Sequence, residues 1–334
     1  MPQILEPTPE NLARCAERLR RGLPVAFPTE TVYGLACDST SEPAVHEVYR
    51  LKQRPQSNPL ITHVLDAKMA KSAVIGWDVR AQRLADAFWP GPLAIILPRR
   101  AEICAASVGG RTTVAVRAPS HPVARALIAA FGGPLSAPSA NRSGRVSPTT
   151  AAHVAEEFAD IDDLPILDGG PCEVGVESTV LDLARARPMI LRPGAITPAD
   201  LEPILGPVAA PDIGAQAASP GTSAVHYAPS TATELVDAAA LRARLDAAHA
   251  AGIARVAVVA AAGTAVAAPD ELLAMPAHPA AYAQLLYATL RKADASGAGL
   301  ILIVSPAERG GIWDAVRDRL RRASAKRFGR ADGV

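Results

Sequence analysis

The residues of this chain with the clearest chemical potential are basic side chains gathered between residues 52 and 145. The cations are Lys52, Arg54, Arg111, Arg117, Arg142 and Arg145, and they surround the run Ser136-Ala137-Pro138-Ser139-Ala140-Asn141. The whole chain has a formal net charge of only +1, and no matching acids stand beside these cations in the sequence. Cations concentrated in this way indicate a site for a polyanion. A small polar loop broken by proline lets a ligand approach the backbone, so we predict a phosphate-bearing small molecule, specifically a nucleotide.

Two polar patterns precede that loop. Thr29-Glu30-Thr31 follows a predicted apolar strand, and it is either a strand exit with a capping turn or a polar cup where α/β folds bind ligands. Lys52 and Arg54 stand at the end of a predicted helix, where cations commonly complement the helix dipole. Because Asn58-Pro59 fixes a turn into the next strand, the alternative is that both cations lie over the sheet edge.

Two further patterns follow. Ser139 and Asn141 lie in a loop that reaches Ser147 just before a predicted helix, so the segment is either a plain turn or an anion-binding loop at a helix N-terminus. Farther on, GVESTV (175–180) precedes an apolar run that ends at Arg192. A guanidinium in that position is a candidate phosphate contact.

Several other kinds of site are excluded by missing patterns. The sequence has no GxxxxGK[ST], HExxH or GxSxG, and His63, His121, His153 and His226 are too scattered to form a transition-metal ligand set. The four cysteines form no CxxC pair, which favours a reduced, cytoplasmic protein over a disulfide framework or a zinc site. We expect neither a secretory signal nor a membrane span, because no apolar run approaches about 18 residues.

The elements that must position these residues follow from apolar periodicity and from capping signals. Helices are predicted over residues 8–22, 42–50, 81–88, 121–130 and 148–158. Strands are predicted over residues 24–27, 60–64, 93–97, 113–117, 135–137, 166–167, 178–183 and 189–192. Because helices and strands alternate irregularly, we predict an α/β fold with a mixed sheet.

The composition changes from Pro203 to Pro229, where Pro, Gly, Ala and Ser dominate and no period holds. Beyond it, strands at 233–236, 255–260 and 300–304 alternate with helices at 238–249, 280–295 and 312–326. This alternation predicts a smaller Rossmann-like α/β domain with a parallel sheet, although without the GxGxxG of a dinucleotide site. The predicted organisation is a first domain over 1–206, a linker over 207–229 and a second domain over 230–334.

Taken in order, these patterns resemble the YrdC-like family. The matching blocks are PTETVYGL (28–35), K-x-R (52–54), WPGPL (89–93), TVAVRAP (113–119), SAPSAN (136–141), GVESTV (175–180) and LRPG (191–194). The linker pieces Ser219-Pro220-Gly221-Thr222 and His226-Tyr227-Ala228-Pro229, with the C-terminal domain, resemble two-domain members. The resemblance implies a twisted sheet with a concave basic cavity, and the activity of L-threonylcarbamoyladenylate synthases.

The resemblance also implies roles for individual residues. The implied L-threonine-binding residues are Thr31, His63, Arg117, Ala137 and Ser178. The implied ATP-binding residues are Arg54, Asn58, Thr113, Ser139, Asn141, Ser147, Arg192, His226 and Tyr227, and Lys52 and Arg54 are the implied catalytic residues. The protein supplies no metal ligand, and Mg²⁺ arrives with ATP. One departure is Ser223-Ala224-Val225, where many relatives carry a basic residue.

The implied reaction joins L-threonine, bicarbonate and ATP into threonylcarbamoyl-AMP with release of pyrophosphate, which makes the enzyme a nucleotidyltransferase. A separate tRNA threonylcarbamoyl transferase then uses the product for threonylcarbamoyladenosine (t6A) modification of tRNA. One alternative is a carbamoyl transferase on the same sheet, but those relatives are larger and carry acylphosphatase and zinc-finger segments. Another is a non-catalytic RNA-binding or ribosome-binding module, whose affinity would depend steeply on salt. Weak RNA binding can also coexist with catalysis.

Overall fold

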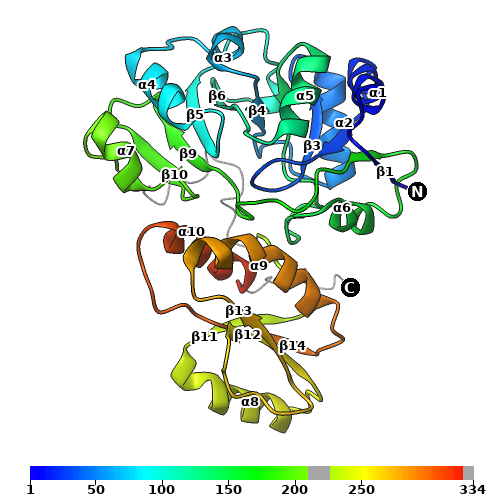
Figure 1. Cartoon of the computed structure of the whole chain (residues 1–334), viewed down its shortest axis with the longest axis vertical. Helices are drawn as coiled ribbons and strands as arrows, with labels where there is room; N and C mark the ends of the chain where they lie inside the picture. Colours follow the sequence, from blue (N-terminus) through cyan, green and yellow to red (C-terminus); the bar gives the residue numbers. More distant parts are fainter. Residues whose placement is uncertain (210–225, 326–334) are drawn as a thin grey trace, which may run out of the picture. The chain divides into compact units, whose positions relative to one another are not determined.

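The chain divides into two units in the computed structural model, which describes residues 1–209 and 226–325 (Figure 1). The first unit comprises Met1–Ser143 and the segment that begins at Ser147. The second comprises Gly144–Val146 and the described residues from 226 onward. The short segment Gly144–Val146 therefore groups with the second unit, although the predicted first domain included it. Most of the predicted linker, including residues 219–225, lies outside the described residues.

A ten-stranded sheet of mixed direction forms the centre of the first unit. In chain order the strands are β1 (Gln3–Leu5), β2 (Val25–Phe27), β3 (Gly34–Asp38), β4 (Ile61–His63), β5 (Leu93–Pro98), β6 (Thr113–Arg117), β7 (Leu135–Ser136), β8 (Pro165–Leu167), β9 (Thr179–Asp182) and β10 (Met189–Arg192). In space their order is β1-β8-β2-β3-β7-β4-β6-β5-β9-β10. Strand β6 pairs parallel with β4 and antiparallel with β5, so the predicted mixed sheet is confirmed.

Helices lie on both faces of this sheet. They are α1 (Pro9–Arg20), α2 (Glu42–Lys52), α3 (Ala67–Ala73), α4 (Val79–Phe88), α5 (Pro122–Phe131), α6 (Ala151–Glu157) and α7 (Pro198–Leu205), with a 3₁₀ turn η1 (Ala106–Val108). Thr8 caps α1 as predicted, and its hydroxyl accepts a hydrogen bond from the backbone N–H of Asn11 at 3.2 Å. The helix predicted from Pro148 instead begins at Ala151, because Thr150 caps it. Elements β1, β3, α3 and α7 had not been predicted.

Apolar packing assigns each helix to a face. Helices α1 and α5 pack on one face of β8, β2, β3 and β7, whereas α2 and α6 pack on the other. Helices α3, α4 and α7 continue the second face over β5, β6, β9 and β10. On the first face, the corresponding cluster consists of strand residues alone: Ile61, Ala94, Ile96, Ala115, Val180 and Leu191, with Met189 beside them.

Strand register places predicted site residues on that strand-lined part of the sheet. His63 on β4 lies directly beside Arg117 on β6, as Ile61 lies beside Ala115. Side chains alternate along a strand, so Thr113, Ala115 and Arg117 share one face. Because Ala115 belongs to the strand-lined cluster, Arg117 and Thr113 point to the same side of the sheet.

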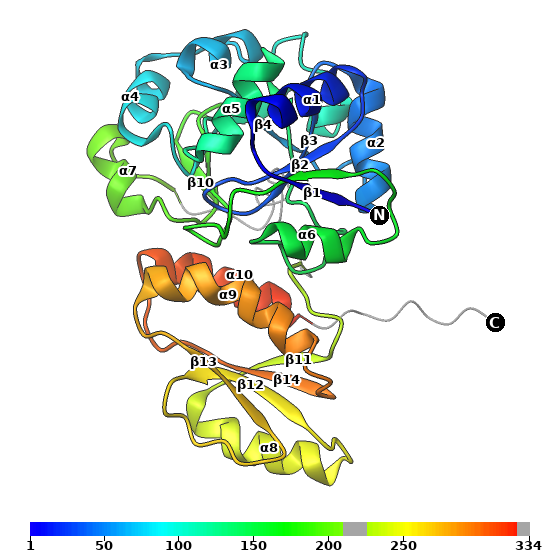
Figure 2. The ribbon, with the colours of Figure 1, turned by 45° about the vertical axis from the view of Figure 1, so that its right-hand side comes forward.

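The second unit is a four-stranded parallel sheet. Its strands are β11 (Thr233–Val236), β12 (Val256–Ala261), β13 (Glu271–Met275) and β14 (Leu300–Val304), in the spatial order β11-β14-β12-β13. Helix α8 (Leu241–Ala250) covers one face, and α9 (Pro279–Asp294) and α10 (Ile312–Ala323) cover the other (Figure 2). The predicted parallel α/β domain is confirmed, although β13 had not been predicted.

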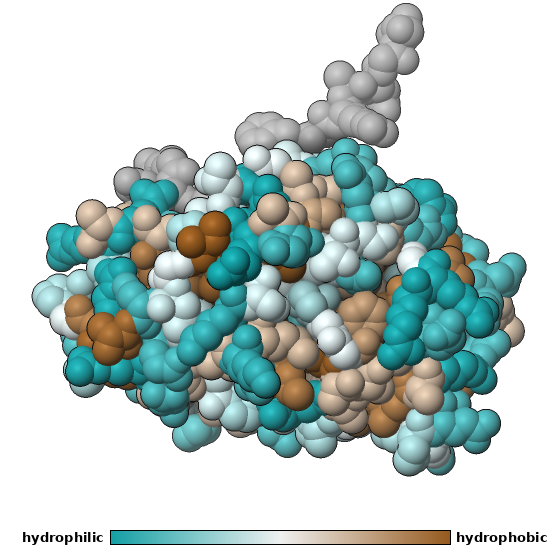
Figure 3. All heavy atoms as spheres, turned by 90° about the horizontal axis from the view of Figure 1, so that it is seen from above, coloured by the Kyte–Doolittle hydropathy of each residue, from teal (hydrophilic) through white to brown (hydrophobic). Residues whose placement is uncertain are grey.

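The surface seen from above belongs to the first unit and mixes hydrophobic with hydrophilic groups (Figure 3). The large exposed hydrophobic side chains of the first unit come from separate segments, as Ile4, Leu23 and Ile75 illustrate. Within residues 1–209 and 226–325, no helix has the length and apolar character that crossing a membrane requires.

Candidate active site

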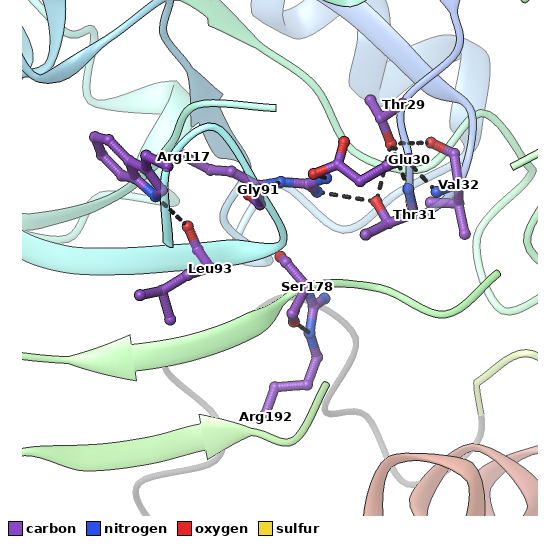
Figure 4. Close-up of polar contacts among 10 residues, drawn as sticks. Thr29, Glu30, Thr31, Val32, Gly91, Leu93, Arg117, Ser178 and Arg192 are labelled. Atoms are coloured by element: carbon purple, nitrogen blue, oxygen red, sulfur yellow. Dashed lines mark hydrogen bonds and ion pairs between the residues drawn. The ribbon is translucent and has the colours of Figure 1, made fainter. Parts of the chain in front are cut away.

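Arg117, the last residue of β6, is held by three groups from other parts of the first unit (Figure 4). Its Nη2 lies 2.7 Å from Oε1 of Glu30, and its Nη1 donates to the Thr31 hydroxyl at 2.9 Å. Its Nε donates to the carbonyl oxygen of Gly91 at 3.3 Å. Arg117 is buried, so one guanidinium is fixed in place beside His63 and Thr31.

The turn that carries Glu30 is built by the hydroxyl of Thr29. This hydroxyl donates to the carbonyl oxygen of Val32 at 2.6 Å and accepts from the backbone N–H groups of Thr31 and Val32, each at 3.2 Å. The Thr31 hydroxyl lies 2.9 Å from it. The turn therefore holds the Thr31 hydroxyl where Arg117 can donate to it, and its use as a cup for a ligand stays a prediction.

Ser178 and Arg192 form a second buried group, next to strands β9 and β10. Arg192 donates from Nε and Nη2 to the carbonyl oxygen of Ser178 at 3.1 and 3.0 Å. Its Nη2 also lies 3.1 Å from the Ser178 hydroxyl. A residue predicted to contact threonine and one predicted to contact ATP are thus direct neighbours.

Lys52, the last residue of α2, is 1% exposed and reaches the Ser/Asn loop. Its Nζ donates to the backbone carbonyl oxygen of Ser139 at 2.6 Å and to that of Asn141. Burial, followed by the nearby charge of Arg54, lowers the pKa of the Lys52 ammonium well below its usual value. Lys52 therefore supports the predicted nucleotide loop by donating hydrogen bonds to two of its backbone carbonyl oxygens.

The remaining predicted residues of the first unit lie around these groups. Arg54 donates to the carbonyl oxygens of Asn58 and Pro59 at 3.1 and 2.9 Å, so it fixes the turn before β4. Ser147 is buried, and its hydroxyl donates to Oε1 of Glu177 at 2.7 Å. Thr113 begins β6. Ala137 follows β7, and its N–H donates to the carbonyl oxygen of Ile61 at 2.9 Å.

His226 and Tyr227 are described with the second unit. Their rings are 4.1 Å apart, and the Tyr227 ring lies 5.4 Å from Tyr287 of α9 and 5.6 Å from the guanidinium carbon of Arg319. Tyr227 has a positive φ of 61°, which is uncommon for a residue with a side chain. Both residues are buried, so they form part of an aromatic cluster.

The order of these groups along the chain agrees with comparisons to known families. The family model Sua5_yciO_yrdC, described as "Telomere recombination", matches residues 17–194. The model Sua5_C, described as "Threonylcarbamoyl-AMP synthase, C-terminal domain", matches residues 196–325.

The chain belongs to the Sua5/YciO/YrdC family. The threonylcarbamoyl-AMP synthase of Pyrococcus abyssi is 37% identical over 320 residues, which cover 93% of each chain. That of Bacillus subtilis is 44% identical over 223 residues, covering 65% of this chain and 64% of the relative. The crystal structure of P. abyssi Sua5 complexed with L-threonine superposes with a TM-score of 0.89 at 34% identity and covers 97% of each chain. This likeness confirms the family and the predicted fold class, whereas the basic cavity stays a prediction.

Two acids of this Sua5/YciO/YrdC member were missed when the site was predicted. Glu30 and Glu177 are both buried, and they contact Arg117 and Ser147 respectively. The prediction that the cations lack matching acids is therefore wrong for the folded chain, because Glu30 lies against Arg117. It holds only for residues adjacent in the sequence. A single acid inside an otherwise uncharged block, as in PTETVYGL and GVESTV, was the available signal.

Two of the arginines left without a predicted role have structural contacts. Arg142 makes an ion pair with Asp160 at 2.6 Å, donates to the carbonyl oxygen of Leu51 at 2.9 Å and lies over the ring of Phe158. Arg111 donates to the carbonyl oxygen of Ser57 at 2.8 Å. Arg142 therefore ties the segment just after α6 to the end of α2.

The charges around Arg117 are set by burial and by the ion pair. Burial alone would raise the pKa of the Glu30 carboxyl, but the charge and hydrogen bond of Arg117, with backbone N–H groups, hold that pKa below its usual value. Burial and the Arg117 charge lower the pKa of His63 to about 3. At neutral pH, Arg117 is therefore positive, Glu30 is negative and His63 is neutral.

This neutral histidine predicts an acid-dependent loss of stability. An unfolded chain protonates His63 near pH 6.5, whereas the folded chain does not, so stability falls as the pH drops below that value. We expect His63 to account for about 2 kcal/mol of the free energy of unfolding lost between pH 7.0 and 5.0. Urea unfolding at both pH values should show a smaller loss for His63→Gln than for the wild type.

A matched control is His249, whose pKa is raised, first by its hydrogen bond with Asp270. A raised pKa stabilises the fold at acid pH and the effect is lost as the pH rises, so His249→Gln should not reduce the acid loss. An identical acid loss in wild type and His63→Gln would contradict the assignment of a neutral His63.

Proposed function

We propose that this protein is an L-threonylcarbamoyladenylate synthase, which makes threonylcarbamoyl-AMP from L-threonine, bicarbonate and ATP and releases pyrophosphate. The observation that carries the proposal is the end-to-end likeness, in sequence and fold, to the P. abyssi enzyme, of which a complex with L-threonine is known. The product serves t6A modification of tRNA. Both units of the chain share this likeness, which favours the two-domain synthase over a larger carbamoyl transferase.

In this reaction the Arg117 end of the site takes the amino acid. A planar guanidinium pairs well with a carboxylate, and the fixed rotamer of Arg117 presents it without reorganisation. Thr31 and His63 stand beside it, and Ser178 and Ala137 complete the predicted set. Short polar side chains of this kind suit a small hydroxy amino acid.

Lys52 and Arg54 act at the triphosphate end. An ammonium has three N–H donors, and two of those on Lys52 meet the carbonyl oxygens of Ser139 and Asn141. The third donor serves a phosphate oxygen of ATP. The loop that Lys52 shapes then supplies Ser139 and Asn141 to the nucleotide. Asn58, Thr113, Ser147 and Arg192 complete the part of the proposed ATP-binding set that lies in the first unit.

The chemistry is a nucleotidyl transfer that requires no enzyme nucleophile. The threonine amine combines with bicarbonate to give a carbamate and water. A carbamate oxygen then attacks the α-phosphorus of ATP, the bond to the β-phosphate breaks, and pyrophosphate leaves. The protein contributes positioning and charge neutralisation. Mg²⁺ would enter with ATP and would neutralise charge on its phosphates, while Glu30 and Glu177 contact Arg117 and Ser147.

The product is an activated adenylate that another enzyme must consume. We place the protein in the cytoplasm, where a separate tRNA threonylcarbamoyl transferase uses the adenylate. Weak direct RNA binding is compatible with this role and would be recognised by a steep loss of affinity with salt.

The decisive experiment incubates the full chain with ATP, Mg²⁺, bicarbonate and each amino acid in turn, and measures pyrophosphate release. We expect release that requires both L-threonine and bicarbonate. Release without bicarbonate would indicate a different adenylation reaction. No release with any amino acid would favour the RNA-binding alternative over an enzyme.

A further inference from the structure

Glu30 is a buried carboxylate at the amino-acid end of the site, and the proposed reaction gives it no role. Its side chain and that of Arg117 are each only 4% exposed, and the two point toward each other (Figure 4). The backbone of Glu30 is fixed as well, since its carbonyl oxygen accepts from the N–H of Val174 at 2.8 Å. A charge held this firmly affects any ligand that reaches Arg117.

The charges of the Arg117–Glu30 pair sum to zero before a ligand arrives. Arg117 contributes one positive charge and Glu30 one negative charge. His63 is neutral, and burial raises the pKa of the nearby Cys172 thiol to about 12, so it is neutral too. The site is therefore not the purely cationic one that the sequence indicated.

Arg117 nevertheless keeps hydrogen-bonding capacity for a carboxylate. A guanidinium has five N–H donors. The hydrogen bonds to Gly91 and Thr31 use one N–H on Nε and one on Nη1. Nη2 lies 2.7 Å from Oε1 of Glu30 as an ion pair, but it makes no hydrogen bond within the described part of the chain. At least one N–H on each terminal nitrogen is therefore left, which is the number that a bidentate carboxylate needs.

We propose that Glu30 is a specificity-determining residue that makes the Arg117 end of the site select an α-amino acid zwitterion over a simple carboxylate. The inference rests on the proposed function, in which Arg117 meets the carboxylate of L-threonine. A simple carboxylate brings a second negative charge beside Glu30, and their repulsion is strong because the pair is buried. A zwitterion also carries an ammonium one carbon away from its carboxylate, and this ammonium compensates the charge of Glu30.

The same geometry separates this role from proton transfer. Because Arg117 keeps the pKa of the Glu30 carboxyl low, Glu30 is a weak base and accepts a hydrogen bond from the ammonium without removing its proton. Glu30 therefore acts in selecting and orienting the amino acid, before the amine reacts.

The test compares two ligands that differ only in the amino group, L-threonine and (R)-3-hydroxybutyrate, by calorimetric titration of the full chain. We expect the wild type to prefer L-threonine by at least about 100-fold. In Glu30→Gln, this preference should shrink by at least about tenfold, with weaker threonine binding and unchanged or tighter hydroxybutyrate binding. Equal weakening of both ligands, with the preference retained, would overturn the proposal, because a merely structural residue predicts that result.

Two further variants keep the test decisive. Thr31→Val removes the other side-chain contact of Arg117 without changing any charge, so it should weaken both ligands and leave the preference unchanged. Glu30→Asp keeps the negative charge, so it should retain most of the preference for L-threonine over (R)-3-hydroxybutyrate. This variant is used for the comparison if Glu30→Gln does not fold. The proposed function fails separately, if the wild type releases no pyrophosphate with L-threonine. If the wild type is active and Glu30→Gln keeps its preference, only the role of Glu30 is wrong.

Discussion

Replacing Arg117 with alanine should lower the free energy of unfolding by about 3–5 kcal/mol, because it leaves the Glu30 carboxylate buried without its partner. The same change should reduce threonine-dependent pyrophosphate release at least about 100-fold, since the guanidinium contacts the amino acid's carboxylate. Urea unfolding and a pyrophosphate assay on the purified variant measure the two effects. A variant that retained both wild-type stability and wild-type turnover would contradict the assignment of Arg117.

The double variant Glu30→Ala/Arg117→Ala separates the two effects. Removing both charges leaves no buried ion unpaired, so most of the lost stability should return. Activity should not return, because neither alanine can bind a carboxylate. If stability and activity recovered together, the loss in the single variant would be a folding defect and Arg117 would not be a substrate contact.

The sequence predicts those parts of the fold that depend on local composition. The strands at Thr113–Arg117, Met189–Arg192 and Leu300–Val304 were predicted with their observed bounds, because apolar residues, with β-branched ones among them, dominate each run. Strand β3 was missed, since Gly34 and Asp38 bound a run of low strand propensity that is buried by its neighbours. Strand β13 has no β-branched residue and was missed for the same reason.

For the candidate site, the sequence predicts which side chains take part but not which of them contact each other. The cations were found because they cluster between residues 52 and 145, and the family motifs supplied their roles. Glu30 and Arg117 come from distant parts of the chain, and only the folding of the first unit brings them together. No local pattern says which cation meets which acid, so the neutralisation of Arg117 by Glu30 could be known only from the structure.

Replacing Lys52 should also have a large effect, on stability as well as on activity, because its ammonium is buried against the Ser139–Asn141 loop. We expect Lys52→Met to lower the free energy of unfolding by about 1–3 kcal/mol, because the carbonyl oxygens of Ser139 and Asn141 lose a buried donor. Methionine has a similar length without charge, so the packing is largely kept. In the pyrophosphate assay, kcat/KM for ATP should fall at least about 100-fold, since both the phosphate contact and the loop geometry are lost.

A matched control stands on the same helix. Arg50 is in the last turn of α2, but its side chain is 66% exposed and makes an ion pair with the nearby Glu47. Arg50→Met removes the same unit of charge from the same helix end, and the free energy of unfolding should change by no more than about 0.5 kcal/mol. Its kinetic constants for ATP and L-threonine should match those of the wild type, so any larger effect in Lys52→Met belongs to the buried contacts.

The kinetic constants of Lys52→Met distinguish two roles of Lys52, supporting the Ser139–Asn141 loop and contacting the triphosphate. If Lys52 both shapes the Ser139–Asn141 loop and contacts the triphosphate, the fall in kcat/KM should be larger for ATP than for L-threonine, and the calorimetric affinity for L-threonine alone should change little. A folded variant with reduced stability but wild-type kcat/KM for ATP would confine Lys52 to supporting the loop. The triphosphate would then be neutralised by Arg54 and Mg²⁺ without it.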